Sequence, residues 1–214
     1  PDAEIHALVG PWSAQILSNY PQVDRVLTLP FPGFSRSPKE SIRFPYQLAL
    51  RSARHLRLIG YDSAIIFRPD HWWGAMLAFL AGIPHRIGYD LPDVKQFLTQ
   101  SFTHEKQHVV QQNLKLVSHW TRDIDLHDIN FNFAVNEADT AFIDGYLAEW
   151  NITPEQNILC IHPGSGTWVK RWKADRWAII ADTLSDQLDC IVIFTGGDHE
   201  MSLVDEITAQ MSTP

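Results

Sequence analysis

The 214-residue chain has 45% hydrophobic and 20% charged residues, which is the composition of an ordinary globular protein. Its net charge of −8 argues against non-specific nucleic-acid binding, which requires a basic surface, but leaves room for a local basic pocket. No apolar stretch reaches the roughly 18 residues that cross a bilayer, and no signal peptide opens the chain.

The first half alternates short apolar strands with helices. Gly60 and Gly82 follow two of these helices and predict C-terminal caps. The segment 91–104 has no clear period, and we interpret it as a mobile loop. Strands are predicted at 5–10, 23–29, 63–67 and 85–89, and helices at 13–20, 45–59, 72–81 and 106–120.

The second half repeats the alternation after a polar, aperiodic linker at 121–133. Repeated strand–helix units predict a parallel sheet with helices on both faces, so the fold class is α/β. We place one domain at 1–130 and a second at 131–214. Further elements are predicted at 136–150 (helix, capped by Asn136), 157–161 (strand), 174–187 (helix), 191–195 (strand) and 202–211 (helix).

Two cysteines, Cys160 and Cys190, each lie within a short apolar run, so both are predicted to be buried in strands. Two isolated cysteines form neither a zinc-ligand pattern nor a disulfide framework. A reducing cytoplasmic location is compatible with this usage. The chain begins almost inside a strand and ends on a helix with no strand after it, so we expect a fragment of a longer protein.

The strongest local motif is the strand-to-helix turn at 162–173, HPGSGTWVKRWK. Ligands of open α/β sheets bind beyond the carboxyl ends of the strands, and a helix N-terminus favours phosphate. Gly164 and Gly166 permit close approach of the backbone, Ser165 and Thr167 add hydroxyl groups, and Lys170 adds a positive charge. The alternative is an ordinary turn followed by solvated basic residues. Neither the dinucleotide-binding pattern nor the P-loop pattern is complete here.

The next strand ends in TGGDHE, residues 195–200, which is predicted to lie beside the first turn. Gly196 allows a close approach, and Glu200 could accept hydrogen bonds from a ribose. The alternative for Glu200 is an acid placed at a helix start by the helix dipole. His199 and Glu200 begin like a zinc-protease motif, but Leu203 stands where that motif requires histidine.

In the first half, Arg68 follows the strand 63–67 and lies at a second candidate ligand edge. Asp70 is predicted to cap the following helix. Arg86 either faces a ligand cleft or only decorates the strand 85–89. Trp72 and Trp73 are interpreted as core or interface packing.

The run HPGSGTWVKRWKADRWAIIADTL followed by IVIFTGG resembles glycosyltransferase family 9, the ADP-heptose:lipopolysaccharide heptosyltransferase group. The segment YDSAIIFRPDHWWGAMLAFLAGIPHRIGYD is similar to the first domain of that family. This resemblance implies a GT-B fold of two Rossmann-like domains, both incomplete in this chain. It also implies that Ser165, Thr167 and Lys170 contact the donor diphosphate, that Glu200 contacts the nucleotide and that the first domain binds the acceptor. Arg68 and Arg86 are our candidates for the acceptor side.

The resemblance further implies a catalytic aspartate that would lie before residue 1 and a donor-binding Asp-Ser/Thr-Gly-x-x-His motif that would lie beyond Pro214. The chain by itself is therefore expected to be inactive. The expected reaction is inverting sugar transfer from a nucleotide sugar, with ADP-heptose favoured, to a glycan or lipid-linked acceptor. We expect no cofactor, metal or nucleic acid, and a cytoplasmic protein with peripheral contact to the inner membrane as an option. The alternatives are a non-catalytic nucleotide-binding module and a GT-B-type sugar-nucleotide epimerase.

Overall fold

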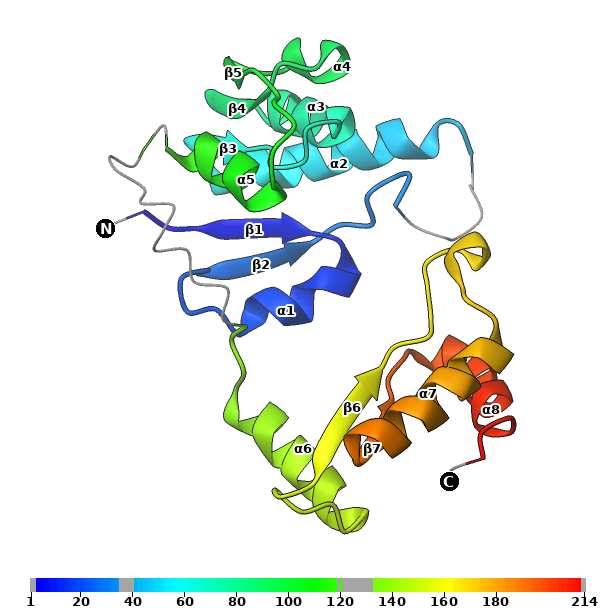
Figure 1. Ribbon diagram of the computed structural model, residues 1–214. Coiled ribbons are helices and arrows are strands. Elements are labelled where there is room, and N and C mark those ends of the chain that lie inside the picture. Colours follow the sequence, from blue (N-terminus) through cyan, green and yellow to red (C-terminus); the bar gives the residue numbers. More distant parts are fainter. Residues whose placement is uncertain (1–2, 35–40, 119, 121–132, 213–214) are drawn as a thin grey trace. The chain divides into compact units, whose positions relative to one another are not determined.

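The computed structural model describes residues 3–34, 41–118, 120 and 133–212 (Figure 1). The chain separates into two compact units, Pro1–Ala134 and Val135–Pro214. The predicted boundary at 130/131 and most of the predicted linker lie outside the described residues. Both units consist of parallel strands connected through helices, so the predicted α/β class is confirmed.

Unit 1 contains two parallel ladders. The first pairs β1 (His6–Val9) with β2 (Arg25–Thr28), with His6 opposite Arg25, and η1 (Pro11–Ser13) and α1 (Ala14–Ser18) connect them. The second has the order β3–β4–β5. Its elements and the helices between them are β3 (Ser63–Ile65), α3 (Trp72–Leu80), β4 (His85–Tyr89), α4 (Pro92–Lys95), β5 (Gln100–Phe102) and, after it, α5 (Val109–Val117).

The interpretation of 91–104 as a mobile loop is wrong. This segment contains α4 and β5, and β5 pairs with β4 through Ile87 opposite Gln100. Both elements are too short for hydrophobic periodicity to be visible, and the strand exists because a neighbouring strand pairs with it. The helix predicted at 106–120 is also shorter than expected, since α5 ends at Val117.

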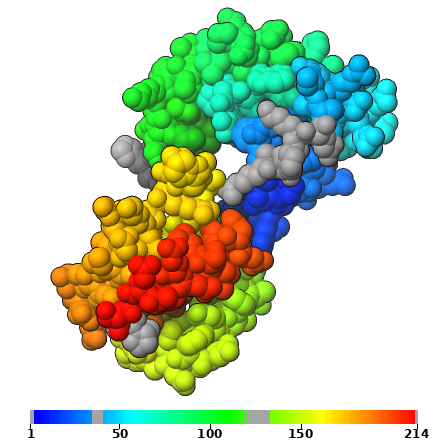
Figure 2. Space-filling model, turned by 90° about the vertical axis from the view of Figure 1, so that its right-hand side faces the viewer, coloured from blue at the N-terminus to red at the C-terminus, as the bar shows by residue number. Residues whose placement is uncertain are grey.

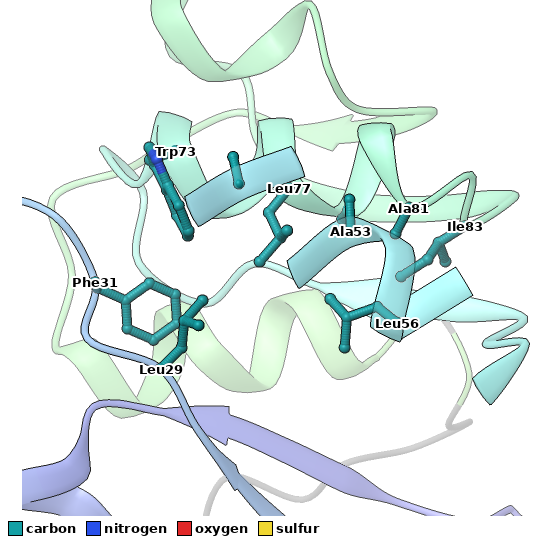
Figure 3. Packing of buried hydrophobic residues seen from close by; sticks show 10 residues of the cluster. Leu29, Phe31, Ala53, Leu56, Trp73, Leu77, Ala81 and Ile83 are labelled. Atoms are coloured by element: carbon teal, nitrogen blue, oxygen red, sulfur yellow. The ribbon is translucent and has the colours of Figure 1, made fainter. Parts of the chain in front are cut away.

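The core of unit 1 lies where α2 (Phe44–Ile59) packs against α3 (Figure 3). Ala49 and Ala53 are buried in α2, and these small side chains let the two helices approach closely. Trp73 of α3 packs edge-on against Phe31, with ring centroids 5.7 Å apart. The predicted cap at Gly60 is confirmed, because its φ of 80° is in the left-handed region that glycine adopts without strain.

Unit 2 begins with α6 (Glu137–Glu149), whose first turn is closed by Asn136 and Asp139 in reciprocal capping bonds. β6 (Asn157–Ile161) and β7 (Cys190–Phe194) pair in parallel. The remaining elements are η3 (Trp168–Lys170), α7 (Ala174–Leu188), η4 (Asp198–Glu200) and α8 (Met201–Thr208). In Figure 2, the orange atoms of α7 and the red atoms of α8 lie side by side. A cluster of buried apolar side chains joins the two helices.

The two cysteines are a second correction. Cys160 is exposed and Cys190 is half-buried. In β6 the side chains of Ile158 and Cys160 share one face and are exposed, whereas Ile161 on the other face is buried. An apolar run therefore shows where a strand lies, but not that both of its faces are covered. In the described part of the chain, no helix is long and apolar enough to cross a membrane.

Candidate functional site

The turn after β6 runs from His162 to the start of α7 at Ala174. Pro163 is buried, whereas the residues from Gly166 onward are exposed. A single 3-10 turn, η3, separates the small residues from the helix. Lys170 ends η3 with an exposed side chain, and no ion pair or hydrogen bond of its ammonium group occurs among the residues that the structure describes.

The turn after β7 is tied directly to the first one. The Thr195 backbone N–H donates to the Ile161 carbonyl at 2.9 Å, which holds the two strand ends level. Glu200, at the end of η4, is 5% exposed and the only buried charged side chain among the described residues. Its Oε2 accepts a hydrogen bond from the Gly197 backbone N–H at 3.0 Å.

Gly164 and Glu200 are in close contact across the two turns. A Cβ atom at Gly164 would lie 1.9 Å from Glu200 Oε1, and a Cβ at Gly196 would lie 3.2 Å from Oε2. Gly164 is therefore glycine because a carboxylate occupies the space of its side chain. The two turns that the sequence predicts to be neighbours meet at this carboxylate.

Two histidines flank the same carboxylate. His162 Nε2 lies 3.8 Å from Glu200 Oε2, and His199 Nε2 lies 3.9 Å from Oε1. The sequence reasoning considered His199 only as a metal ligand and assigned no role to His162. The sequence could have indicated both histidines. His162 directly follows one strand of a parallel pair, and His199 lies next to Glu200, which follows the other strand. No cluster of three or more metal-ligating side chains occurs among the described residues.

The pKa of Glu200 is lowered, chiefly by the hydrogen bond from the Gly197 N–H. Burial opposes this shift, and the positive charges of His199, His162 and Arg171 add to it. The carboxylate is therefore ionised at neutral pH and keeps acceptor capacity for a ligand.

Glu200→Gln is expected to change the acid stability of unit 2. Because the folded-state pKa is lowered, the ionised carboxylate stabilises the fold above its unfolded pKa of about 4.3, and this contribution disappears as the pH falls toward the folded pKa. The free energy of unfolding, measured by urea denaturation at pH values from neutral to acidic, should thus decline less steeply below about pH 5 in the variant than in the wild type. Identical pH profiles would contradict the assigned hydrogen bond.

At the carboxyl edge of β3, Arg68 forms a two-pronged ion pair with Asp70, with Nε–Oδ1 and Nη2–Oδ2 distances of 2.5 and 3.1 Å. This hydrogen bonding raises the pKa of Arg68 and lowers that of Asp70. The guanidinium carbon lies 4.7 Å from the centre of the Phe34 ring. Asp70 is thus not the helix cap that the sequence predicted, because its carboxylate is used by Arg68 and the N-cap position of α3 is His71.

His71 lies beside this ion pair and packs edge-on against Phe31 and Phe34, with ring centroids 5.0 and 5.4 Å away. Its Nε2 is buried and has no hydrogen-bond partner among the described residues. Burial lowers the pKa of His71, and the charge of Arg68 lowers it further. The imidazole is therefore neutral at pH 7.

Arg86 lies at the amino end of β4, whereas ligands of such sheets bind at carboxyl ends. Its Nε donates to the Phe97 carbonyl at 2.6 Å, its Nη1 donates to the Ile83 carbonyl, and its guanidinium lies 5.4 Å from the Phe79 ring centre. This placement favours the alternative in which Arg86 supports the strand, and Arg86 is not part of the acceptor site proposed below.

The family model for "Glycosyltransferase family 9 (heptosyltransferase)" matches residues 49–214, which include both candidate edges. The chain belongs to glycosyltransferase family 9. It is 23% identical over 223 residues to lipopolysaccharide heptosyltransferase 2 of Escherichia coli K12, with 100% of this chain and 60% of that protein covered. The family 9 chain therefore spans about 60% of the length of the curated relative.

Two solved structures show the same fold. The family 9 glycosyltransferase of Veillonella parvula matches with a TM-score of 0.76 and 18% identity, over 99% of this chain and 58% of that chain. The E. coli ADP-heptose lps heptosyltransferase II matches with a TM-score of 0.70 and 20% identity, over 100% and 61%. The fold of the family 9 chain is accordingly of the GT-B type, with its parallel strands distributed over two α/β units.

Proposed function

We propose that the protein transfers a sugar from a nucleotide-sugar donor to a lipopolysaccharide or other glycan acceptor, with inversion at the anomeric carbon. The favoured donor is ADP-heptose and the site of action is the cytoplasm. Membership of family 9 supports glycosyl transfer in general and does not favour the epimerase or the non-catalytic alternative. The names of two relatives, which mention lipopolysaccharide and ADP-heptose, support the finer assignment. The main support for the proposed donor site is that two strand-to-helix turns meet at Glu200.

On the donor side, the residues have complementary tasks. The backbone of Gly164–Thr167 and the ammonium group of Lys170 would hold the diphosphate, whose negative charge grows as the glycosidic bond breaks. Lys170 suits this role because its exposed charge is not used by another described side chain. Glu200 would accept a hydrogen bond from a ribose hydroxyl through Oε1, since Oε2 is occupied by Gly197. Gly196 lies beside the other oxygen, where a Cβ atom would come within 3.2 Å of Oε2.

On the acceptor side, a hydroxyl group must lose its proton before it attacks the anomeric carbon. The proposed base is an aspartate that we expect, by resemblance to the family, to lie before Pro1. Arg68 is the candidate for orienting an anionic acceptor group, because it follows β3 at the carboxyl edge. Its exposed ion pair with Asp70 contributes at most about 1 kcal/mol, so a phosphate could compete for the guanidinium.

Lys170→Ala is expected to weaken ADP binding by roughly 10-fold or more, because a charge-assisted hydrogen bond to phosphate contributes about 1.5–3 kcal/mol. The free energy of unfolding should change by less than about 0.5 kcal/mol, since the side chain is exposed. Isothermal titration calorimetry with ADP measures the first effect, and urea denaturation measures the second.

Lys173→Ala is the matched control. Lys173 is an exposed lysine at the N-cap position of α7 and differs from Lys170 only in its place along the turn. ADP affinity should change little in this variant. Equal losses in both variants would show a general charge effect, and unchanged affinity in Lys170→Ala would remove the diphosphate role assigned to Lys170.

A further inference from the structure

The charge of α2 differs in sign from that of the rest of the molecule. Residues 41–61 contain four arginines and no aspartate or glutamate. This stretch carries +4, against −8 for the whole chain and −12 for the remainder. The helix does not need these positive charges for packing, because only its apolar side packs against the core. Their concentration on one helix is therefore a feature of the protein surface.

One face of α2 is in the core, and the opposite face is open. Ala49, Ala53 and Leu56 are buried against α3 and its neighbours. On the open face, two adjacent rows with four-residue spacing are exposed. The first row is Leu50, Arg54 and Leu58, and the second is Arg43, Gln47 and Arg51.

Arg51 and Arg54, one from each row, are not used to hold together the described part of the fold. Among the described residues, neither Arg51 nor Arg54 makes a side-chain ion pair or hydrogen bond. Arg57, outside the two rows, does have a structural role, because it donates to the Leu80 carbonyl at 2.7 Å. Within the described part of the chain, the charges of Arg51 and Arg54 are thus available to an external anion.

Exposed apolar side chains accompany the arginines. Leu58 is 86% exposed, and Ile42, just before the helix, is 90% exposed. A site for a soluble anion gains nothing from such side chains, whereas a lipid surface accepts both kinds. Basic groups meet the phosphates, and leucine and isoleucine enter the boundary between headgroups and acyl chains. The negative charge elsewhere on the chain is screened beyond about 8–10 Å at physiological salt.

We propose that the open face of α2, formed by Arg43, Gln47, Leu50, Arg51, Arg54 and Leu58, docks on the surface of an anionic lipid bilayer. This docking proposal rests on the proposed function in one respect, because an enzyme that acts on a lipid-linked acceptor meets that acceptor at a bilayer. The arginines supply attraction to the anionic headgroups, and Leu50 and Leu58 supply shallow insertion.

The test is co-sedimentation of the full chain with vesicles. Wild type should pellet with phosphatidylcholine vesicles that contain phosphatidylglycerol, and less with pure phosphatidylcholine. The double variant Arg51→Gln, Arg54→Gln should bind about 25-fold more weakly, because each basic residue near an anionic surface contributes about fivefold. Leu50→Ser with Leu58→Ser should reduce the binding that persists at about 1 M salt, where the Debye length is about 3 Å.

Lys95→Gln with Lys106→Gln is the control, because it removes the same charge from exposed positions outside α2. An equal loss in this control, or no binding of wild type to anionic vesicles, would overturn the proposal. So would a leucine variant that binds vesicles as wild type does, since that result indicates a surface for polyanions in general. ADP calorimetry keeps the two proposals apart: Lys170→Ala should retain vesicle binding, and the α2 variants should retain ADP binding.

Discussion

Gly164→Ala is expected to reduce ADP affinity at least about 10-fold and to destabilise unit 2 by about 1–3 kcal/mol. The new Cβ would lie 1.9 Å from Oε1 and 2.2 Å from Cδ of Glu200, distances at which one group must move. The carboxylate is the more movable partner, but leaving its place breaks its bond from Gly197. The proposed donor pocket would then lose both its acid and the contact that joins its two turns.

Gly145→Ala is the matched control in the same unit. Gly145 lies inside α6, and a Cβ there would meet nothing within 4 Å. This change should stabilise unit 2 by about 0.5–1 kcal/mol, because alanine favours the helix over glycine. ADP calorimetry and urea denaturation apply to both variants. Normal ADP binding by Gly164→Ala would show that the donor site does not depend on the Gly164–Glu200 contact.

Trp73→Ala is expected to destabilise unit 1 by about 3–5 kcal/mol, the usual cost of an aromatic-to-alanine change in a core. Trp73 is 2% exposed and packs from α3 into the core that contains Phe31 and the buried residues of α2 (Figure 3). Its Nε1 also donates to the Pro45 carbonyl at 3.1 Å, so the truncation leaves both a cavity and an unpaired carbonyl. Urea denaturation followed by tryptophan fluorescence and circular dichroism measures the loss.

Trp72→Ala is the control for this change. The two tryptophans are adjacent in sequence, and the sequence alone treats them alike, but Trp72 is 39% exposed. Its truncation should cost no more than about 1 kcal/mol. Equal costs in the two variants would mean that Trp73 does not occupy the core position described above.

The neighbouring tryptophans show what a local sequence pattern can predict and what it cannot. Periodicity placed the helix 72–81, and the structure has it at Trp72–Leu80, because a run of apolar residues followed by Gly82 is a local signal. Which tryptophan is buried depends on where α2 and Phe31 lie. The segment 91–104 shows the same limit, since β5 is a strand through its pairing with β4.

Arg86 shows an alternative that the sequence left open. The strand 85–89 was predicted correctly, but whether Arg86 faces a ligand or supports the strand depends on partners outside the strand, the carbonyls of Phe97 and Ile83. Asp70 shows a prediction that the structure contradicts. The capping role followed a sound local preference, but the guanidinium of Arg68 competes successfully for the carboxylate.

The sequence by itself determined most of the strands and helices, the α/β class and the residue types of the turn 164–170, because these depend on neighbours along the chain. It also named Glu200, although the residues alone favoured a role at a helix start and only the family resemblance raised the ligand role. Only the tertiary structure decided that this carboxylate is buried beneath Gly164 between His162 and His199. The sequence predicted that the two turns are neighbours, but the contact between Glu200 and Gly164 depends on how β6 pairs with β7, and no local pattern encodes it.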